Sequence, residues 1–129
     1  MKFVFSHHAI CSSDLKQSEK FYQDFLGLKK VDGWCNTAPD GSWQIDFYHD
    51  GVTAWMLEVK WDAHHCGKYN HGDITSDHIA FGVENVEEAR NAALSAGYNS
   101  TELDENGNCM ITDPDGYQIE VCNCKDVFE

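Results

Sequence analysis

Residues 77–90, DHIAFGVENVEEAR, predict a strand that leads directly into a helix. Apolar and small side chains alternate along the strand, which is the pattern of a strand with one buried face. The apolar residues are Ile79, Phe81 and Val83, and the others are His78, Ala80 and Gly82. We expect the apolar face to pack on the helix. The opposite face then carries His78 among residues too small to cover it, so this histidine is available to a ligand.

A second copy of this pattern lies near the N-terminus, where residues 6–15 are SHHAICSSDL. His7 corresponds to His78, and a helix start follows each strand after a short interval. A glycine that would end the helix follows in each copy, Gly27 in the first and Gly97 in the second. The chain therefore contains an internal repeat, and this repeat decides the fold.

The last strands of the two copies also correspond. Residues 56–59 are MLEV and residues 118–121 are QIEV, so Glu58 matches Glu120. Each copy therefore runs from a histidine on its first strand to a glutamate on its last strand.

The repeat predicts an α+β fold in which two paired βαβββ modules form a curved mixed β-sheet. We expect a single domain over residues 1–129, made of modules 1–62 and 77–124 joined by the connection 63–76. Strands are expected at 3–11, 28–31, 43–48 and 55–60, and then at 77–83, near 98, at 108–112 and at 117–122. Each module has one helix, which follows the N-cap Asp14 in the first and covers 86–96 in the second.

The composition is that of a globular protein, with 42% hydrophobic residues and no apolar run long enough to cross a membrane. The formal net charge is −13, and residues 73–129 hold thirteen acidic side chains against two basic ones. Such a field repels nucleic acid and anionic membrane surfaces, so we expect neither as a partner. We expect a cytoplasmic protein whose six cysteines are reduced, because no secretory signal is recognisable.

Four side chains occupy matching positions in the two modules: His7, Glu58, His78 and Glu120. If the modules pair about a pseudo-twofold axis, all four meet as a metal site on the concave face of the sheet. Two imidazoles and two carboxylates suit a divalent metal ion of borderline softness, and the carboxylates neutralise its charge. Four protein ligands leave two octahedral positions for water or substrate oxygens, as in a catalytic site. Packing alone does not explain the set, because a glutamate on a covered sheet face is costly unless it is paired.

Two other histidine sets compete with this assignment. His8 is adjacent to His7 and would point to the opposite face, where the repeat aligns it with Ile79. The connection contains the other set, His64, His65, Cys66 and His71. These residue types suit zinc, but their spacing resembles no finger or ribbon. We expect the connection to be a solvated loop, which could also enclose a substrate.

On these motifs, the chain resembles the vicinal oxygen chelate superfamily, and within it the glyoxalase I (lactoylglutathione lyase) family. The resemblance covers nearly the whole sequence. Its motifs are His7, Asp14-Leu15, Ser18, Phe21-Tyr22, Leu26-Gly27-Leu28, Leu57-Glu58, His78-Ile79-Ala80-Phe81, Asp113-Pro114-Asp115-Gly116-Tyr117 and Ile119-Glu120. The His-Glu-His-Glu set is the most informative part, because dioxygenases and fosfomycin-modifying transferases of this fold lack a counterpart of Glu58.

The resemblance implies a lyase or isomerase that acts on an α-hydroxycarbonyl adduct by proton transfer through a metal-bound enediolate. Such an adduct is the 2-oxoaldehyde hemithioacetal that forms in methylglyoxal detoxification. A glutamate released from the metal would carry the proton, Glu120 first and Glu58 second. The resemblance also implies one divalent ion per site, with nickel or cobalt favoured and zinc as the third candidate. The family further suggests a homodimer whose sites lie at the interface and combine modules of two chains.

The substrate side departs from the family pattern. Cys11 stands where the family has a glutathione-binding arginine, and Asp62 stands where it has an asparagine. Residues 101–108, TELDENGN, are acidic where the family has lysines. Anionic glutathione would therefore lose charge-assisted contacts and meet carboxylates. We expect Cys11, Asp62 and Trp61 to bind the substrate, Trp61 because it lies just past Glu58, and most of the other tryptophans to lie in the core.

Two other functions stay open at this point. A non-catalytic small-molecule binding protein, like the resistance proteins of this fold, would bind no metal and would leave Glu58 and Glu120 unexplained. A metal-dependent dioxygenase would use ferrous iron and consume oxygen, which Glu58 does not favour.

Overall fold

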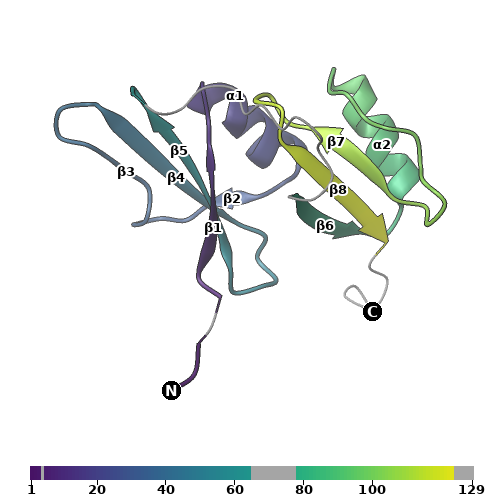
Figure 1. The fold of residues 1–129 in the computed structure, drawn as a ribbon, viewed down its shortest axis with the longest axis horizontal. Coiled ribbons are helices and arrows are strands. Elements are labelled where there is room, and N and C mark those ends of the chain that lie inside the picture. The colour runs from purple at the N-terminus through teal and green to yellow at the C-terminus, as the bar shows by residue number, and fades with distance from the viewer. Residues whose placement is uncertain (4, 65–77, 124–129) are drawn as a thin grey trace. The chain divides into compact units, whose positions relative to one another are not determined.

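The computed structural model describes residues 1–3, 5–64 and 78–123 of the chain. The chain divides into two compact units, Met1–Lys68 and Tyr69–Glu129, called here the first and the second unit (Figure 1). Within the described residues, no helix is both long and apolar enough to cross a membrane. The fold of each unit follows from its own strand pairing and its own core.

The first unit contains a mixed sheet in the strand order β1-β5-β4-β2, with β3 also paired to β4. Its strands are β1 (His7–Cys11), β2 (Lys29–Lys30), β3 (Asn36–Thr37), β4 (Trp43–His49) and β5 (Met56–Asp62). The pair β1 and β5 is parallel, whereas β2, β3 and β5 each pair with β4 in antiparallel orientation. The first and last strands of the repeat therefore lie side by side.

The helical segment of the first unit starts as an α-helix and ends as a π-helix. Asp14 caps α1 (Leu15–Glu19), and its side chain accepts a 3.0 Å hydrogen bond from the Lys16 amide. The π-helical segment η1 (Lys20–Phe25) follows without a break. The wider turn buries two consecutive aromatic side chains, Phe21 and Tyr22, both of which are fully inaccessible to solvent. The sequence predicted one continuous α-helix, and the structure corrects its second half to a π-helix.

The second unit contains a mixed sheet in the order β6-β8-β7 and one helix. Its elements are β6 (Ile79–Val83), α2 (Val86–Ser95), β7 (Cys109–Thr112) and β8 (Gln118–Asn123). The pair β6 and β8 is parallel, as β1 and β5 are in the first unit. Helix α2 packs on β7 and β8, and its N-cap Asn85 accepts a 2.9 Å hydrogen bond from the Glu88 amide.

The core of each unit lies between its helical segment and one sheet face, called here the helix face. In the first unit this face contributes Leu57 and Val59 of β5, and in the second unit Ile119 and Val121 of β8. These four side chains are at most 2% exposed. Because side chains alternate along a strand, the residues between them lie on the opposite sheet face. That opposite face is called here the ligand face, and it carries Glu58 and Glu120.

The predicted fold class is confirmed, and the strands differ most from the prediction at three places. Strand β1 begins at His7 instead of Phe3, because its partner β5 begins at Met56, whose amide already donates to the Ser6 carbonyl. Strand β3 is an addition within the predicted loop. The strand predicted near residue 98 is reduced to one bridge between Ser100 and Ile111.

Candidate metal centre and substrate face

The first unit brings His7 and Glu58 onto one face of adjacent strands. In the parallel pair of β1 and β5, Ala9 is the partner of Glu58 and His7 is the partner of Met56. His7 and Ala9 are two residues apart, so their side chains point to the same face as Glu58. The His7 ring also contacts Phe47 edge-on, with ring centroids 5.4 Å apart, and Phe47 is the β4 partner of Glu58. An imidazole and a carboxylate thus lie diagonally across one ladder.

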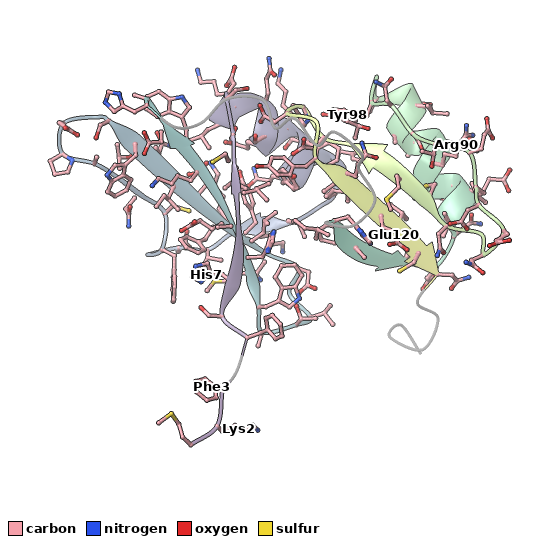
Figure 2. All side chains as sticks on the ribbon, viewed as in Figure 1. Lys2, Phe3, His7, Arg90, Tyr98 and Glu120 are labelled. Carbon is pink, nitrogen blue, oxygen red and sulfur yellow. The ribbon has the colours of Figure 1, made fainter. Side chains whose placement is uncertain are left out.

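The second unit repeats this arrangement in the same register. Ala80 of β6 is the partner of Glu120 of β8, as Ala9 is of Glu58. His78 precedes Ala80 by two residues, and its Nε2 lies 2.5 Å from Oε2 of Glu120. Figure 2 labels one member of each pair, His7 on β1 and Glu120 on β8. The predicted His-to-Glu repeat is therefore a repeat of strand register as well as of sequence.

The donor atoms of both pairs fit a divalent metal ion. In the second unit an imidazole nitrogen and a carboxylate oxygen, both common ligand atoms, already meet at one point. In the first unit Nδ1 of His7 lies 2.9 Å from the Ser6 hydroxyl, which leaves Nε2 as the nitrogen that would bind a metal. No cluster of three or more His, Cys, Asp or Glu side chains occurs among the described residues. Each unit supplies two potential ligands.

The competing histidines differ from His7 in position. His8 is the strand partner of Leu57, which is 2% exposed, so it lies on the helix face as predicted. His64 follows the end of β5, and its amide donates a 2.9 Å hydrogen bond to Oδ1 of Asp62. His65, Cys66 and His71 lie outside the described residues.

The predicted substrate residues divide between the two sheet faces. Cys11 is the strand partner of Lys60, and both lie on the ligand face, two positions along from Ala9 and Glu58. Asp62 lies on the same face, with its Oδ2 3.6 Å from Nζ of Lys60. Trp61 lies on the helix face, because it falls between these two residues on β5. The geometry therefore groups Cys11 and Asp62 with a lysine and separates them from Trp61.

Two further residues next to the candidate ligands had not been singled out from the sequence. Nδ2 of Asn108 lies 3.4 Å from Oε1 of Glu120 and can donate a hydrogen bond to it. Trp34 is 48% exposed and packs edge-on against Phe47, with ring centroids 5.4 Å apart. The expectation that most of the other tryptophans lie in the core is wrong, because Trp34 is exposed and Trp43 and Trp55 are only partly buried. The signal for Asn108 was its spacing, two residues before Met110, which is the β7 partner of Glu120.

Comparison with known proteins identifies the family of the chain. Residues 4–121 match the model of the Glyoxalase/Bleomycin resistance protein/Dioxygenase superfamily. A lactoylglutathione lyase of Haemophilus influenzae is 34% identical over 124 residues, which cover 88% of this chain and 87% of the relative. This homology confirms the expectation of a lyase-type enzyme.

Solved structures show the same fold. The trypanothione-dependent glyoxalase I of Leishmania major superposes with a TM-score of 0.81 at 28% identity, over 98% of this chain and 91% of that one. The fosfomycin resistance protein FosX of Listeria monocytogenes superposes with a TM-score of 0.74 at 17% identity, over 97% and 94% of the two chains, and shows the fold alone. The chain belongs to the Glyoxalase/Bleomycin resistance protein/Dioxygenase superfamily, and the likeness to glyoxalase I predicted from its motifs is confirmed.

Proposed function

We propose that this protein is a metal-dependent lyase or isomerase of the glyoxalase I type, which converts a 2-oxoaldehyde hemithioacetal into a thioester by proton transfer. The observation that carries this proposal is the His-Glu pair that recurs in identical strand register in both units. Packing alone can explain one such pair. It does not explain why the same pair recurs in the same strand register, whereas a shared role in binding a ligand does. A non-catalytic binding protein of the same fold would have no use for either carboxylate.

The proposed metal ligands are His7 and Glu58 of the first unit and His78 and Glu120 of the second. Nickel or cobalt is favoured by the resemblance to short glyoxalase I chains, and zinc is the third candidate. When bound, the ion would polarise two adjacent substrate oxygens and so acidify the neighbouring C–H group. The same resemblance extends the proposal to a homodimer, which a molar mass measured by light scattering would test.

Glu120 is the proposed proton carrier, and Glu58 is the second candidate. A carboxylate can remove the proton from one carbon and return it to the adjacent one, provided that it stays within reach of both. Glu120 already has one oxygen beside His78, so its carboxylate is directed along the ligand face. The apolar and aromatic neighbours of Glu58, Ala9 and Phe47, instead suit a role in ligand binding and in excluding water.

The thiol part of the substrate is proposed to lie against Cys11, Lys60 and Asp62. Lys60 supplies a positive charge beside Cys11, and Asp62 partly neutralises it at 3.6 Å. This pair and the acidic second half of the chain favour a thiol that is less anionic than glutathione. The relatives name two different thiols in their activities, glutathione in Haemophilus influenzae and trypanothione in Leishmania major.

The test is thioester formation from methylglyoxal by protein reconstituted with nickel, cobalt or zinc, with glutathione, trypanothione and small neutral and cationic thiols. Metal-dependent turnover with at least one thiol is the expected result, and the ranking of the thiols measures the contribution of Lys60 and Asp62. Lys60→Met should change the ranking between anionic and cationic thiols and leave the metal content unchanged.

Three outcomes would overturn the proposal. Protein that retains one metal ion per site but turns over no thiol adduct would not be a glyoxalase I. Protein that binds no divalent ion would favour the non-catalytic binding function, and oxygen consumption with ferrous iron would favour a dioxygenase.

A further inference from the structure

Glu120 is held at both carboxylate oxygens by different side chains. Its Oε2 lies 2.5 Å from Nε2 of His78, and its Oε1 lies 3.4 Å from Nδ2 of Asn108. The Glu120 side chain is 23% exposed, so these contacts are partly shielded from water. One oxygen therefore faces the proposed metal ligand, and the other faces an amide donor that carries no charge.

Asn108 is itself fixed by the turn that precedes β7. Oδ1 of Asp104 accepts hydrogen bonds from the amides of Asn106 and Asn108, at 2.8 and 3.0 Å. The Asp104 amide donates to the Asn108 carbonyl at 2.8 Å, and Gly107 completes the turn with a φ of +79°. The backbone of Asn108 is therefore held by hydrogen bonds that do not involve its own side chain. The side-chain amide can donate to Glu120 without taking part in the turn.

The corresponding glutamate of the first unit has no such donor on its strand neighbours. Glu58 is flanked by Ala9 on β1 and Phe47 on β4, and neither side chain can donate a hydrogen bond. Glu120 is likewise flanked by Ala80 and Met110, and Asn108 is the additional polar neighbour. The Asn108 amide is therefore one difference between two carboxylates that occupy matching strand positions.

We propose that Asn108 is a positioning residue that anchors Oε1 of Glu120 and thereby makes Glu120, in preference to Glu58, the carboxylate that transfers the proton. This inference rests on the proposed function. The anchored oxygen keeps the carboxylate in one orientation while the other oxygen exchanges a proton with the substrate carbons. The amide remains a donor throughout and neither gains nor loses a proton.

The test compares Asn108→Leu, which keeps the approximate shape but removes the donor, with Asn106→Leu in the same turn. At saturating metal, Asn108→Leu should lower kcat by about 10- to 100-fold, the range for outer-shell partners of metal ligands, with KM changed less than about twofold. Asn108→Gln, which restores an amide, should recover part of the loss. Asn106→Leu should keep the wild-type kcat, because only the Asn106 backbone takes part in the turn.

A merely structural role would give a different pattern. If Asn108 only stabilised the fold, Asn108→Leu would lower the melting temperature. An Asn108→Gln variant with the same melting temperature would then be no more active than Asn108→Leu. Active wild-type protein with an equally active Asn108→Leu variant would overturn the inference and leave the proposed function intact. Inactive wild-type protein would instead overturn the proposed function.

A measurement on metal-free protein tests the contact without any turnover. The side-chain amide of Asn108 gives a pair of ¹H–¹⁵N resonances, which should shift in Glu120→Gln and stay in place in Glu58→Gln. Resonances that respond equally to both substitutions, or to neither, would show that Asn108 does not distinguish the two carboxylates and would overturn the inference.

Discussion

The two units of this protein share one strand register but surround their carboxylates differently. In the first unit, Glu58 lies between Ala9 and Phe47, and the aromatic ring of Phe47 contacts both His7 and Trp34. In the second unit, Glu120 contacts His78 and Asn108, which are both polar. The register fixes where a histidine and a glutamate stand, whereas the neighbours decide what each carboxylate can do. We infer that the first unit mainly contributes to ligand binding and to the exclusion of water, and that the second unit transfers the proton.

The largest expected effect comes from exchanging the two carboxylates for amides. Glu120→Gln should lower kcat by roughly 10²- to 10⁴-fold, the usual contribution of a positioned general acid or base. Glu58→Gln should lower kcat less, by roughly tenfold, because in our assignment Glu58 transfers the proton only as the second candidate. Thioester formation at saturating metal, with the metal content of each variant measured, separates loss of chemistry from loss of the ion. Equal losses of kcat in the two variants would contradict the assignment of proton transfer to Glu120 in preference to Glu58.

The second effect concerns the two adjacent histidines of β1. His7→Ala should weaken divalent metal binding by more than the roughly 10- to 100-fold typical of outer-shell partners, because a direct ligand is removed. His8→Ala should retain the metal, because His8 lies on the helix face beside Leu57. Isothermal titration of metal-free protein with nickel measures both. Loss of binding in His8→Ala alone would mean that the first unit presents the other histidine.

The repeat predicted the sheet faces, because side-chain alternation is a local property of a strand. The opposite faces of His7 and His8 were assigned in this way, and the N-cap role of Asp14 followed from its position before an amphipathic segment. Contacts across strands were not predictable to the same degree. Lys60 beside Cys11 and Asn108 beside Glu120 both depend on which residues a neighbouring strand presents. Sequence spacing gives the face of a residue, but only the pairing of strands gives its neighbour.

The helix faces of the two units differ as clearly as the ligand faces. Beneath β8 the second unit presents Ile119 and Val121, both at most 2% exposed, and its buried carboxylates Asp113 and Asp115 lie instead in the connection between β7 and β8. Beneath β4 the first unit buries Asp46, which is 4% exposed, with its Oδ2 3.7 Å from Nζ of Lys30. Lys30 also pairs with Glu19 at 2.8 Å. The first unit therefore buries a carboxylate on its helix face beside a lysine.

Removing that cation should destabilise the protein. Lys30→Met should lower the free energy of unfolding by roughly 1–3 kcal/mol, because it leaves the buried Asp46 carboxylate without its counter-charge. The neighbouring Lys29→Met is the matched control, because Lys29 is exposed on the same strand and should change stability by less than about 0.5 kcal/mol. Urea denaturation measures both variants. If Lys30→Met were as stable as Lys29→Met, the ion pair of Lys30 would make no contribution to the stability of the first unit.

The pH dependence sharpens this test. The hydrogen bond to Glu19, followed by the charge of Asp46, raises the pKa of Lys30 above its ordinary value of 10.5. A raised pKa means that the folded state keeps a proton that the unfolded state loses, so the stabilisation is complete below pH 10.5. It declines as the pH rises through the pKa of the folded state. The stability difference between wild type and Lys30→Met should therefore shrink at alkaline pH.

The smallest effect concerns Tyr48, which lies on the same helix face. Its hydroxyl is buried and has no hydrogen-bond partner among the described residues. Because an unpaired buried hydroxyl costs free energy, Tyr48→Phe should leave the free energy of unfolding at pH 7 unchanged or raise it by up to about 1 kcal/mol. Burial, and then the nearby Asp46 charge, raise the pKa of Tyr48 above its ordinary value of 10.0.

The same substitution should also change how the free energy of unfolding depends on pH. Above pH 10.0 the unfolded chain loses the tyrosine proton that the folded state keeps, so wild-type stability falls as the pH rises. Tyr48→Phe lacks this contribution and should lose less stability between pH 9 and pH 11 in urea denaturation. A loss of more than about 1 kcal/mol in Tyr48→Phe at pH 7 would instead mean that the hydroxyl has a bonding partner. The buried Tyr48 hydroxyl would then be paired, and the helix faces of the two units would differ only in the polarity of the side chains that they bury.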